Sequence, residues 1–423
     1  MVHAAIIGGG VVGSGVFEVI EKNGKRIARQ AGDQIVVKRV LDIKTFDPPI
    51  YGDKLTSSAA DVFEDPSICI VAETMGGAGI AYEYTKKALQ AGKHVVTSNK
   101  ELVAKHGPEL LQIAKDHQVR YLFEASVGGG IPIIRPLHQC LAANEIYEIV
   151  GILNGTTNYI LTMMQKEGKD FATALKDAQT NGYAEADPTA DVEGIDACRK
   201  LAILSSIVFQ EYVDSDCIYT EGIANITVED LQYAEQLGMK IKLIAHAKKI
   251  SCESETDDSS TKIFTRVSPL MIDKCDPLAG VEDVFNAIVV KGDAIGEAMF
   301  YGRGAGKLPT ASAVVADMID IVRNPQQNGC STWELPEQDN VLPIEKCAVN
   351  MFIRMVTKND TSEYHDKIAN IFGKVRYVSL DRAPKQEIAF LTDEFTEQDM
   401  KNALAQLKSS DCVQDVVSCI RYL

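Results

Sequence analysis

A glycine-rich turn near the N-terminus limits the possible folds of this 423-residue chain more than any other stretch. The apolar run 3–7 is typical of a buried strand, and it leads through the glycine-rich turn into an amphipathic helix that ends at about residue 30. Glycines permit a tight bend and let backbone N–H groups at the helix N-terminus approach a pyrophosphate. The stretch therefore predicts a Rossmann domain that binds NAD or NADP through Gly8, Gly10, Val11, Val12 and Gly13.

Further ligand-binding loops are expected at the same edge of this sheet. Strands are predicted at 35–41, 67–72 and 93–97, with a helix near 81–91, and an open α/β sheet binds its ligand beyond the carboxyl ends of its strands. Asp42 ends the first of these strands, where a carboxylate suits a ribose diol and repels a 2′-phosphate. The alternative is that Asp42 only caps its loop. The other two loops predict cofactor contacts from Thr74, Met75, Ser98, Asn99 and Lys100.

An acidic stretch that ends at Lys200 is the second informative feature. Its Asp-Pro pair disfavours helix at that point, so we expect a helix to begin near Asp191, which is a good N-cap. Asp196 and Lys200 are then i and i+4 on one helix face, and Glu185 on the approach loop can fold back towards that face. An ammonium between two carboxylates at the edge of an apolar helix predicts a tuned acid or base.

The acidic stretch has two other possible interpretations. One is a solvated loop with an ordinary ion pair, which composition alone favours. The other is a calcium loop, and it fails because the positions that an EF-hand needs as Gly and Glu hold Val192 and Cys198.

Composition restricts the partners and the compartment. The net charge of −16 disfavours nucleic acid and anionic membranes as partners. The ten cysteines form no CxxC pair and no zinc spacing, which fits reduced thiols in the cytoplasm. No apolar run is long enough to predict a transmembrane helix.

The remaining chain predicts two more domains. Strand-rich runs at 145–153 and 240–305, with helices near 156–181, 192–209 and 227–238, indicate an α+β catalytic and dimerisation domain over 131–305. A helix near 310–322 is expected to return to the nucleotide-binding domain, which would then comprise 1–130 and about 306–325. Residues 251–262 are typical of an exposed loop. After a linker at 324–345, the order βαββαβ predicts a ferredoxin-like domain over 345–423.

Several motifs, in one order, resemble those of homoserine dehydrogenase. The acidic stretch matches G-[FY]-A-E-A-D-P followed by D-x-x-G-x-D-x-x-x-K at every fixed position. The resemblance covers residues 1 to about 325 firmly and the tail more loosely, where it implies an ACT regulatory domain. The other motifs that carry it are Thr97–Lys100, Phe123–Pro132, Asn154–Asn158 and Phe300–Gly306.

The resemblance implies a reaction and roles for residues. The expected activity is the NAD(P)-dependent interconversion of L-homoserine and L-aspartate 4-semialdehyde, in threonine, methionine and isoleucine biosynthesis. Lys200 would be the proton donor, and Lys100 would share or relay the proton; the alternative is that Lys100 only binds a phosphate or a helix terminus. The implied substrate-binding residues are Glu185, Asp196, Tyr183 and Thr157, and Gly182 and Gly302 are further cofactor candidates.

The resemblance also implies a sodium site and an oligomer. The ligands would be the carboxylate of Glu124 and the carbonyls of Val127, Gly129 and Ile131, which suit a hard cation, although those glycines can equally be structural. A homodimer or homotetramer is expected. Family members often have Arg where this chain has Leu41, so we expect NAD to be used at least as well as NADP.

The C-terminal tail departs from the usual ACT pattern. The turn after its first strand, 357–364, has no glycine, and Asp360 and Glu363 would repel a carboxylate. We therefore expect the tail to serve mainly in dimerisation, with weak or no inhibition by threonine.

Three rival functions are less consistent with these motifs. A short-chain dehydrogenase would show a Tyr-x-x-x-Lys pair near the proposed site, and an amino-acid sensor would not need the nucleotide fingerprint. A bifunctional aspartokinase fusion is not expected from the length.

Overall fold

The computed structural model describes residues 1–251, 261–325, 333–337, 339–358, 364–381, 383–410 and 412–422. The chain forms two compact units. Unit 1 comprises 1–149, 199–217 and 288–338, and unit 2 comprises 150–198, 218–287 and 339–423. Three elements cross from one unit to the other: strand β7 (Ile146–Ile152), helix α8 (Ile195–Phe209) and strand β11 (Phe285–Gly292). The sequence predicted three domains rather than two compact units, and that division remains a prediction.

Unit 1 contains the predicted doubly wound parallel sheet. Its strands run in the order β3-β2-β1-β4-β5-β6, and every neighbouring pair is parallel. The chain order therefore reverses between β1 and β4, which is where sheets of this kind bind their ligand. The elements are β1 (Val2–Ile7), α1 (Val11–Ala31), β2 (Ile35–Leu41), β3 (Leu55–Thr56), α2 (Ala60–Phe63), β4 (Ile68–Glu73), α3 (Gly79–Gln90), β5 (His94–Thr97), α4 (Lys100–Asp116) and β6 (Tyr121–Leu122), with β12 (Gly296–Arg303) further along the chain.

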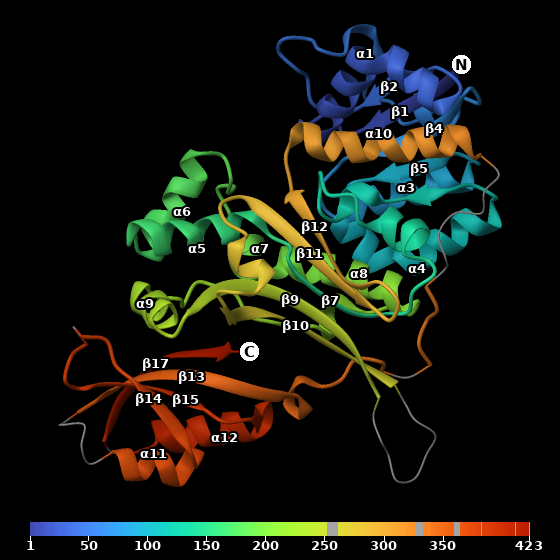
Figure 1. Ribbon diagram of the computed structural model, residues 1–423. Helices are drawn as coiled ribbons and strands as arrows, with labels where there is room; N and C mark the ends of the chain where they lie inside the picture. The colour runs from blue at the N-terminus through green and yellow to red at the C-terminus, as the bar shows by residue number, and fades with distance from the viewer. Residues whose placement is uncertain are drawn as a thin grey trace. The chain divides into compact units, whose positions relative to one another are not determined.

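The predicted late helix is α10 (Lys307–Arg323), and it packs against α1. Figure 1 shows it in orange beside the blue N-terminal helix. Val314, Val315 and Met318 join the core formed by the sheet and α1. The ammonium of Lys307 lies 2.7 Å from the carboxylate of Glu18. Packing and charge thus tie a segment near residue 310 to the first helix.

Unit 2 begins with helices and a long hairpin. Strands β9 (Met239–Ser251) and β10 (Thr261–Asp273) pair antiparallel over their whole length. The single helical region predicted at 156–181 is two helices, because Gly168 ends the first in a left-handed conformation and Asp170 caps the second. The remaining elements of this part are α5 (Gly155–Glu167), α6 (Phe171–Thr180), α7 (Thr189–Val192), β8 (Tyr219–Thr220) and α9 (Val228–Gln236).

The prediction that Asp191 caps the next helix is wrong. Asp191 lies inside the short helix α7, and α8 begins four residues later at Ile195. Asp187 closes the turn before α7, where its carboxylate accepts hydrogen bonds from the backbone and hydroxyl of Thr189.

The C-terminal segment has the predicted ferredoxin-like fold. Its strands form an antiparallel sheet in the order β17-β13-β15-β14, the fourth, first, third and second in chain order. Strand β17 also pairs with β10, which joins this sheet to the hairpin of unit 2. The elements are β13 (Ala348–Thr357), α11 (His365–Phe372), β14 (Val375–Val378), β15 (Glu387–Thr392), β16 (Phe395–Thr396), α12 (Glu397–Lys408) and β17 (Val413–Tyr422).

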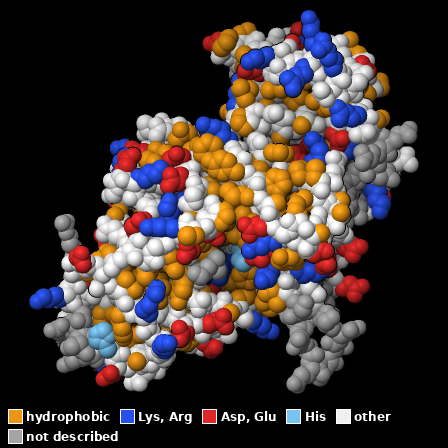
Figure 2. Space-filling model, viewed as in Figure 1, with side chains coloured by type: hydrophobic (Ala, Val, Ile, Leu, Met, Phe, Trp, Pro, Cys, Tyr) orange, Lys and Arg blue, Asp and Glu red, His pale blue; other side chains and the backbone are white. Residues whose placement is uncertain are grey.

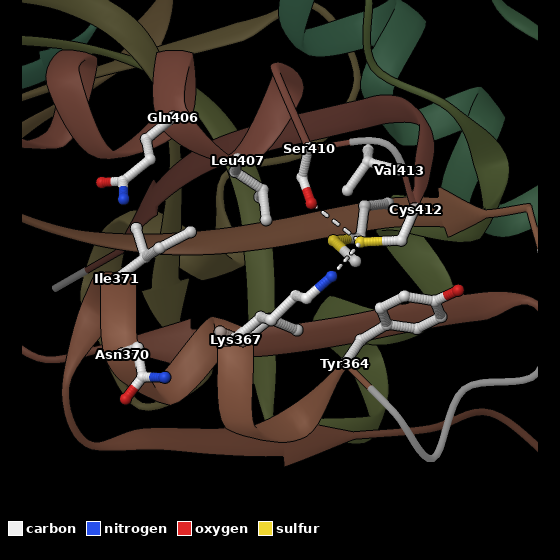
Figure 3. Close-up of a pocket in the computed structure, with 11 residues that line it drawn as sticks. Tyr364, Lys367, Asn370, Ile371, Gln406, Leu407, Ser410, Cys412 and Val413 are labelled. Atoms are coloured by element: carbon white, nitrogen blue, oxygen red, sulfur yellow. Dashed lines mark hydrogen bonds between the residues drawn. The ribbon is translucent and has the colours of Figure 1, made fainter.

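A cavity of about 290 Å³ lies between α11 and α12 (Figure 3). Ile368, Leu407 and Val413 line it with apolar side chains. The ammonium of Lys367 points towards Cys412 and donates a hydrogen bond of 3.4 Å to its sulfur. The cavity therefore lies where these two helices meet the start of β17.

The surface shows mixed charge. On the face drawn in Figure 2, acidic and basic side chains are interspersed, apart from a group of basic side chains over α1. None of the helices in the described part of the chain is both long and apolar enough to span a bilayer. The predicted exposed loop at 251–262 lies almost wholly outside the described residues.

Candidate active site

The glycine-rich turn between β1 and α1 is shaped by close backbone contacts. Gly8 has a φ of 93°, and a Cβ there would lie 2.8 Å from the Met75 side chain. A Cβ on Gly13 would lie 2.0 Å from the carbonyl oxygen of Gly8. No atom lies within 4 Å of a Cβ built on Gly10, while Val11 is exposed and Val12 half-buried. The turn thus leaves open space at the N-terminus of α1, as a dinucleotide pyrophosphate requires.

Asp42 holds this turn from the end of β2. One carboxylate oxygen accepts the N–H of Gly9 at 2.7 Å, and the other accepts the N–H of Lys44 at 2.9 Å. The Tyr51 hydroxyl donates to the carbonyl of Gly9 at 2.5 Å, and burial, followed by the charge of Asp42, raises the pKa of Tyr51 to about 12. Asp42 therefore supports the turn whether or not it also binds a ribose.

The loops after β4 and β5 meet the turn at the same sheet edge. The Thr74 hydroxyl donates to the carbonyl of Gly8 at 2.6 Å. The Asn99 side chain donates to the carbonyl of Gly77 at 2.6 Å and caps α4 by accepting the N–H of Leu102. Ser98 and Lys100 flank Asn99 and are half-buried. The structure thus brings together the cofactor candidates that the sequence predicted from Gly8 to Lys100.

Asn154 joins two carboxylates within unit 2. Its side-chain oxygen accepts the N–H of Thr157 at 2.8 Å and caps α5. Its amide nitrogen donates to Asp191 at 2.7 Å and to Asp196 at 2.8 Å. Two carboxylates at one site repel each other, so the shared donor stabilises their approach. Asp196 and Lys200 are both buried and lie one turn apart on α8.

The other predicted substrate residues differ in their burial and in their contacts with the start of α5. Thr157 is fully buried, and its hydroxyl contacts Asn154. Tyr183 is exposed, but its carbonyl accepts the hydroxyl of Thr156 at 2.7 Å and its ring packs edge-on against Tyr159. Glu185 is exposed, and within the described part of unit 2 its carboxylate forms no hydrogen bond or ion pair. The two predicted substrate carboxylates thus differ in burial, because Glu185 is exposed and Asp196 is buried.

The two remaining cofactor candidates lie in different units. Gly182 follows α6 in unit 2 and has a φ of 73°. Gly302 lies on β12 in unit 1, where a Cβ would contact Ile131 at 3.1 Å.

The loop proposed for sodium has donor atoms of the right kind. Glu124 is buried, and its carboxylate accepts the backbone N–H groups of Ile133, Ile134 and Arg135 at 2.6 to 3.0 Å. None of the carbonyls of Val127, Gly129 and Ile131 accepts a hydrogen bond from a residue that the structure describes. Buried carbonyls without donors next to a carboxylate fit a hard cation, because such a cation takes oxygen ligands.

Comparisons with known proteins agree with these motifs over the whole chain. The family model described as "Homoserine dehydrogenase, NAD binding domain" matches residues 8–124, and the one described as "Homoserine dehydrogenase" matches residues 132–319. The homoserine dehydrogenase of Bacillus subtilis is 37% identical over 434 residues, which cover 99% of this chain and 98% of that protein. The chain belongs to the homoserine dehydrogenase family.

Solved homoserine dehydrogenases share the fold. The crystal structure of a homoserine dehydrogenase from Thiobacillus denitrificans has a TM-score of 0.91 and 38% identity, covering 100% of this chain and 98% of that one. A hyperthermophilic archaeal homoserine dehydrogenase mutant in complex with NADPH has a TM-score of 0.62 and 29% identity, covering 75% and 97%. The family resemblance, the Rossmann-like fold and the NAD(P)-dependent oxidoreductase class inferred from the sequence are thus confirmed.

Sequence reasoning missed the contacts of three residues, two in unit 2 and one in unit 1. Asn154 was expected only as part of a family motif and Asp191 only as an N-cap, whereas the amide of Asn154 donates hydrogen bonds to both Asp191 and Asp196. Glu73 was not considered, although it lies at the end of β4 between the two cofactor loops. The sequence around Asn154 carries no signal of its contacts, because its partners 37 and 42 residues away meet it only after folding.

Proposed function

We propose that this member of the homoserine dehydrogenase family interconverts L-homoserine and L-aspartate 4-semialdehyde with NAD(P) in the cytoplasm, as a step of threonine, methionine and isoleucine biosynthesis. The observation that carries the proposal is the pair of carboxylates, Asp191 and Asp196, that the Asn154 side chain holds together. An ammonium and fixed carboxylates at one end of an apolar helix suit a substrate that has an ammonium group and a carbonyl that must be protonated.

In this proposal the lysines transfer the proton and the other side chains bind the substrate. The bound nicotinamide supplies or accepts the hydride. Lys200 gives its proton to the carbonyl oxygen during reduction and takes it back during oxidation, and Lys100 shares or relays that proton. Asp196 and Glu185 hold the ammonium and hydroxyl groups of the substrate, with Tyr183 and Thr157 beside them. A positioned acid is worth about 10² to 10⁴ in rate.

The cofactor preference and the sodium site are proposed from different residues. Asp42 at the end of β2 disfavours a 2′-phosphate, so NAD is used at least as well as NADP. Glu124 and the carbonyls of Val127, Gly129 and Ile131 would hold sodium, which would stabilise the turned loop rather than take part in the proton transfer. The active form is a homodimer or homotetramer, and nucleic acid and membranes are not partners.

The test is an assay of homoserine oxidation with NAD and NADP in parallel, followed by the absorbance of the reduced nicotinamide. Homoserine-dependent reduction of at least one cofactor is expected. A protein that binds NADH in a fluorescence titration but reduces neither cofactor would contradict the proposed reaction and leave the dinucleotide site intact.

A further inference from the structure

Glu73 is a fully buried carboxylate between the two cofactor loops of unit 1. It is the last residue of β4 and is 0% exposed. One carboxylate oxygen accepts the backbone N–H of Met75 at 2.7 Å, in the loop after β4. The other accepts the hydroxyl of Thr97 at 2.5 Å, at the end of β5. The same Thr97 oxygen accepts the N–H of Asn99 at 2.9 Å, so one carboxylate reaches both loops.

We propose that Glu73 is a positioning residue of the dinucleotide site, and that its ionised carboxylate braces the loops 74–77 and 97–100 while its protonation releases them. The proposal rests on the proposed use of NAD(P) by these loops. It concerns residues that touch the cofactor candidates Met75 and Asn99, and it assigns Glu73 no contact with substrate.

The observed hydrogen-bond directions fit the ionised form. A carboxylate accepts every bond that Met75 and Thr97 offer, whereas a protonated carboxyl turns one oxygen into a donor. That donor would face the N–H or the hydroxyl already present, so one of the two bonds must be lost or reversed. A hydrogen bond to a charged acceptor is stronger than a bond to a neutral one. Protonation of Glu73 therefore weakens the contacts that hold the two loops in place.

The pKa of Glu73 lies well above that of an ordinary carboxyl group. Burial raises its pKa to about 7, against the hydrogen bonds from Thr97, Met75 and Asn99, which lower it. The titratable side chains of the neighbouring strands are His3 on β1 and His94 on β5. They pair with Ile68 and Ile70, at least three residues or about 10 Å along the strand from Glu73. On the adjoining helices, Lys100 and Glu101 begin α4, and Glu83 is exposed on α3.

Stability and loop order should respond to pH in opposite directions. A carboxyl group whose pKa is raised in the folded state stabilises the fold below its unfolded pKa and loses that contribution as pH rises through about 7. Above that pH the ionised carboxylate is costly to bury but braces both loops. The Glu73→Gln variant imitates the protonated form at every pH.

The experiment measures NADH affinity and amide hydrogen exchange between pH 6 and pH 8 for the full-length protein. In the wild type, NADH should bind about tenfold more tightly at the higher pH, the size expected for one hydrogen bond to a charged group. In the cofactor-free protein, the amides of Met75 and Asn99 should become more protected over the same range after correction for intrinsic exchange. E73Q should keep the weak affinity and fast exchange of the acidic wild type throughout, and should melt at a higher temperature than the wild type at pH 8.

Two further variants keep the test decisive. Thr97→Val removes a hydrogen bond that lowers the pKa of Glu73, so the midpoint of the affinity change should move to higher pH even if E73Q folds poorly. Glu83→Gln, an exposed glutamate on α3, should leave affinity and its pH dependence unchanged. Equal affinity and equal pH dependence in E73Q and the wild type would overturn the proposal. Absence of homoserine oxidation in the wild type, with the NADH and exchange changes present, would overturn only the proposed reaction.

Discussion

At the scale of single residues, one amide group holds the two aspartates of the candidate site. Asn154→Ala removes hydrogen bonds to Asp191 and Asp196 together with the cap of α5. Each bond to a charged group is worth about 1.5–3 kcal/mol, and the cap about 1 kcal/mol. We expect kcat/KM for homoserine to fall at least about 10²-fold, because the carboxylates separate.

The control for Asn154 is another N-cap. Asp170 caps α6 through the N–H of Thr173 and makes no contact with the site carboxylates. Asp170→Ala should lower stability by about 1 kcal/mol and leave kcat/KM nearly unchanged. Equal losses of activity in both variants would mean that Asn154 acts only through helix stability.

Lys200 carries the proposed proton transfer. Lys200→Met keeps the length of a buried side chain and removes its ammonium, so turnover should fall by about 10² to 10⁴ while NADH affinity stays within about twofold. Steady-state kinetics and a fluorescence titration of NADH measure the two effects. More than about a tenth of wild-type activity in the variant would reject the assigned role.

Asp42 tests the cofactor preference. Asp42→Ala removes the acceptor for the N–H of Gly9 as well as the charge that repels a 2′-phosphate. We therefore expect weaker binding of both cofactors, with the larger loss for NAD. Parallel kinetics with NAD and NADP measure the ratio. A strong NADP preference that the substitution leaves unchanged would show that Asp42 does not face the ribose.

The residues that the sequence predicted well are those whose chemistry is local. Gly8, Gly13 and Asn99 act within a turn or a helix start, and short motifs specify them. Glu73 meets Thr97, and Asp191 meets Asn154, only through folding, and no spacing in the sequence encodes these contacts. A motif can also fail to predict the surroundings of a residue. Glu185 lies within a family motif, but the motif did not predict that its side chain is exposed.

At the scale of elements, the spacing of apolar residues and the capping residues predicted most helices and strands. The errors fell where a short break interrupts an otherwise helical pattern, at Gly168 and between α7 and α8. The ferredoxin-like tail was predicted because each strand and helix there has a clear pattern of its own. The pairing of β17 with β10 was not predicted, since it joins segments about 150 residues apart.

Phe372 anchors α11 to the sheet of the tail through aromatic contacts with Phe390 and Phe395. Phe372 at the end of α11 is 2% exposed, and its ring packs edge-on against Phe390 at 5.3 Å. Phe372→Ala should cost about 3–5 kcal/mol. Hydrogen exchange should then increase across α11 and β15, with the sheet of unit 1 unaffected. Ile371→Ala, half-buried on the same helix, should have a smaller effect; equal effects would show that Phe372 is not an anchor of this packing.

At the scale of the whole molecule, the tail is part of unit 2 rather than an appendage to it. Arg354 on β13 pairs with Asp230 at 2.9 Å, and Asp230 is 0% exposed. Removing the tail near Pro343 would strand that carboxylate and expose the edge of β10, so the shortened chain should lose solubility or structure. Regulation is therefore better tested in the full-length protein.

We expect threonine to inhibit the full-length enzyme weakly or not at all. The turn 357–364 lacks glycine and has two acidic residues, and Asn359–Glu363 lie outside the described residues. Titration of threonine into the homoserine assay measures the effect. Strong inhibition that a substitution in this turn removes would instead assign an effector site to the tail.

The separation of α1 and α10 along the chain has a consequence for synthesis on the ribosome. Val16 and Ile20 on α1 share a core with residues of α10, which begins about 280 residues after α1 ends. At about 5–20 residues per second, roughly 15 to 55 s pass between the emergence of the two helices. During that interval the apolar face of α1 awaits its partner while the nascent chain continues to grow. The part of α1 that α10 covers is thus among the last surfaces to be buried, and it is the segment on which we expect a chaperone to act.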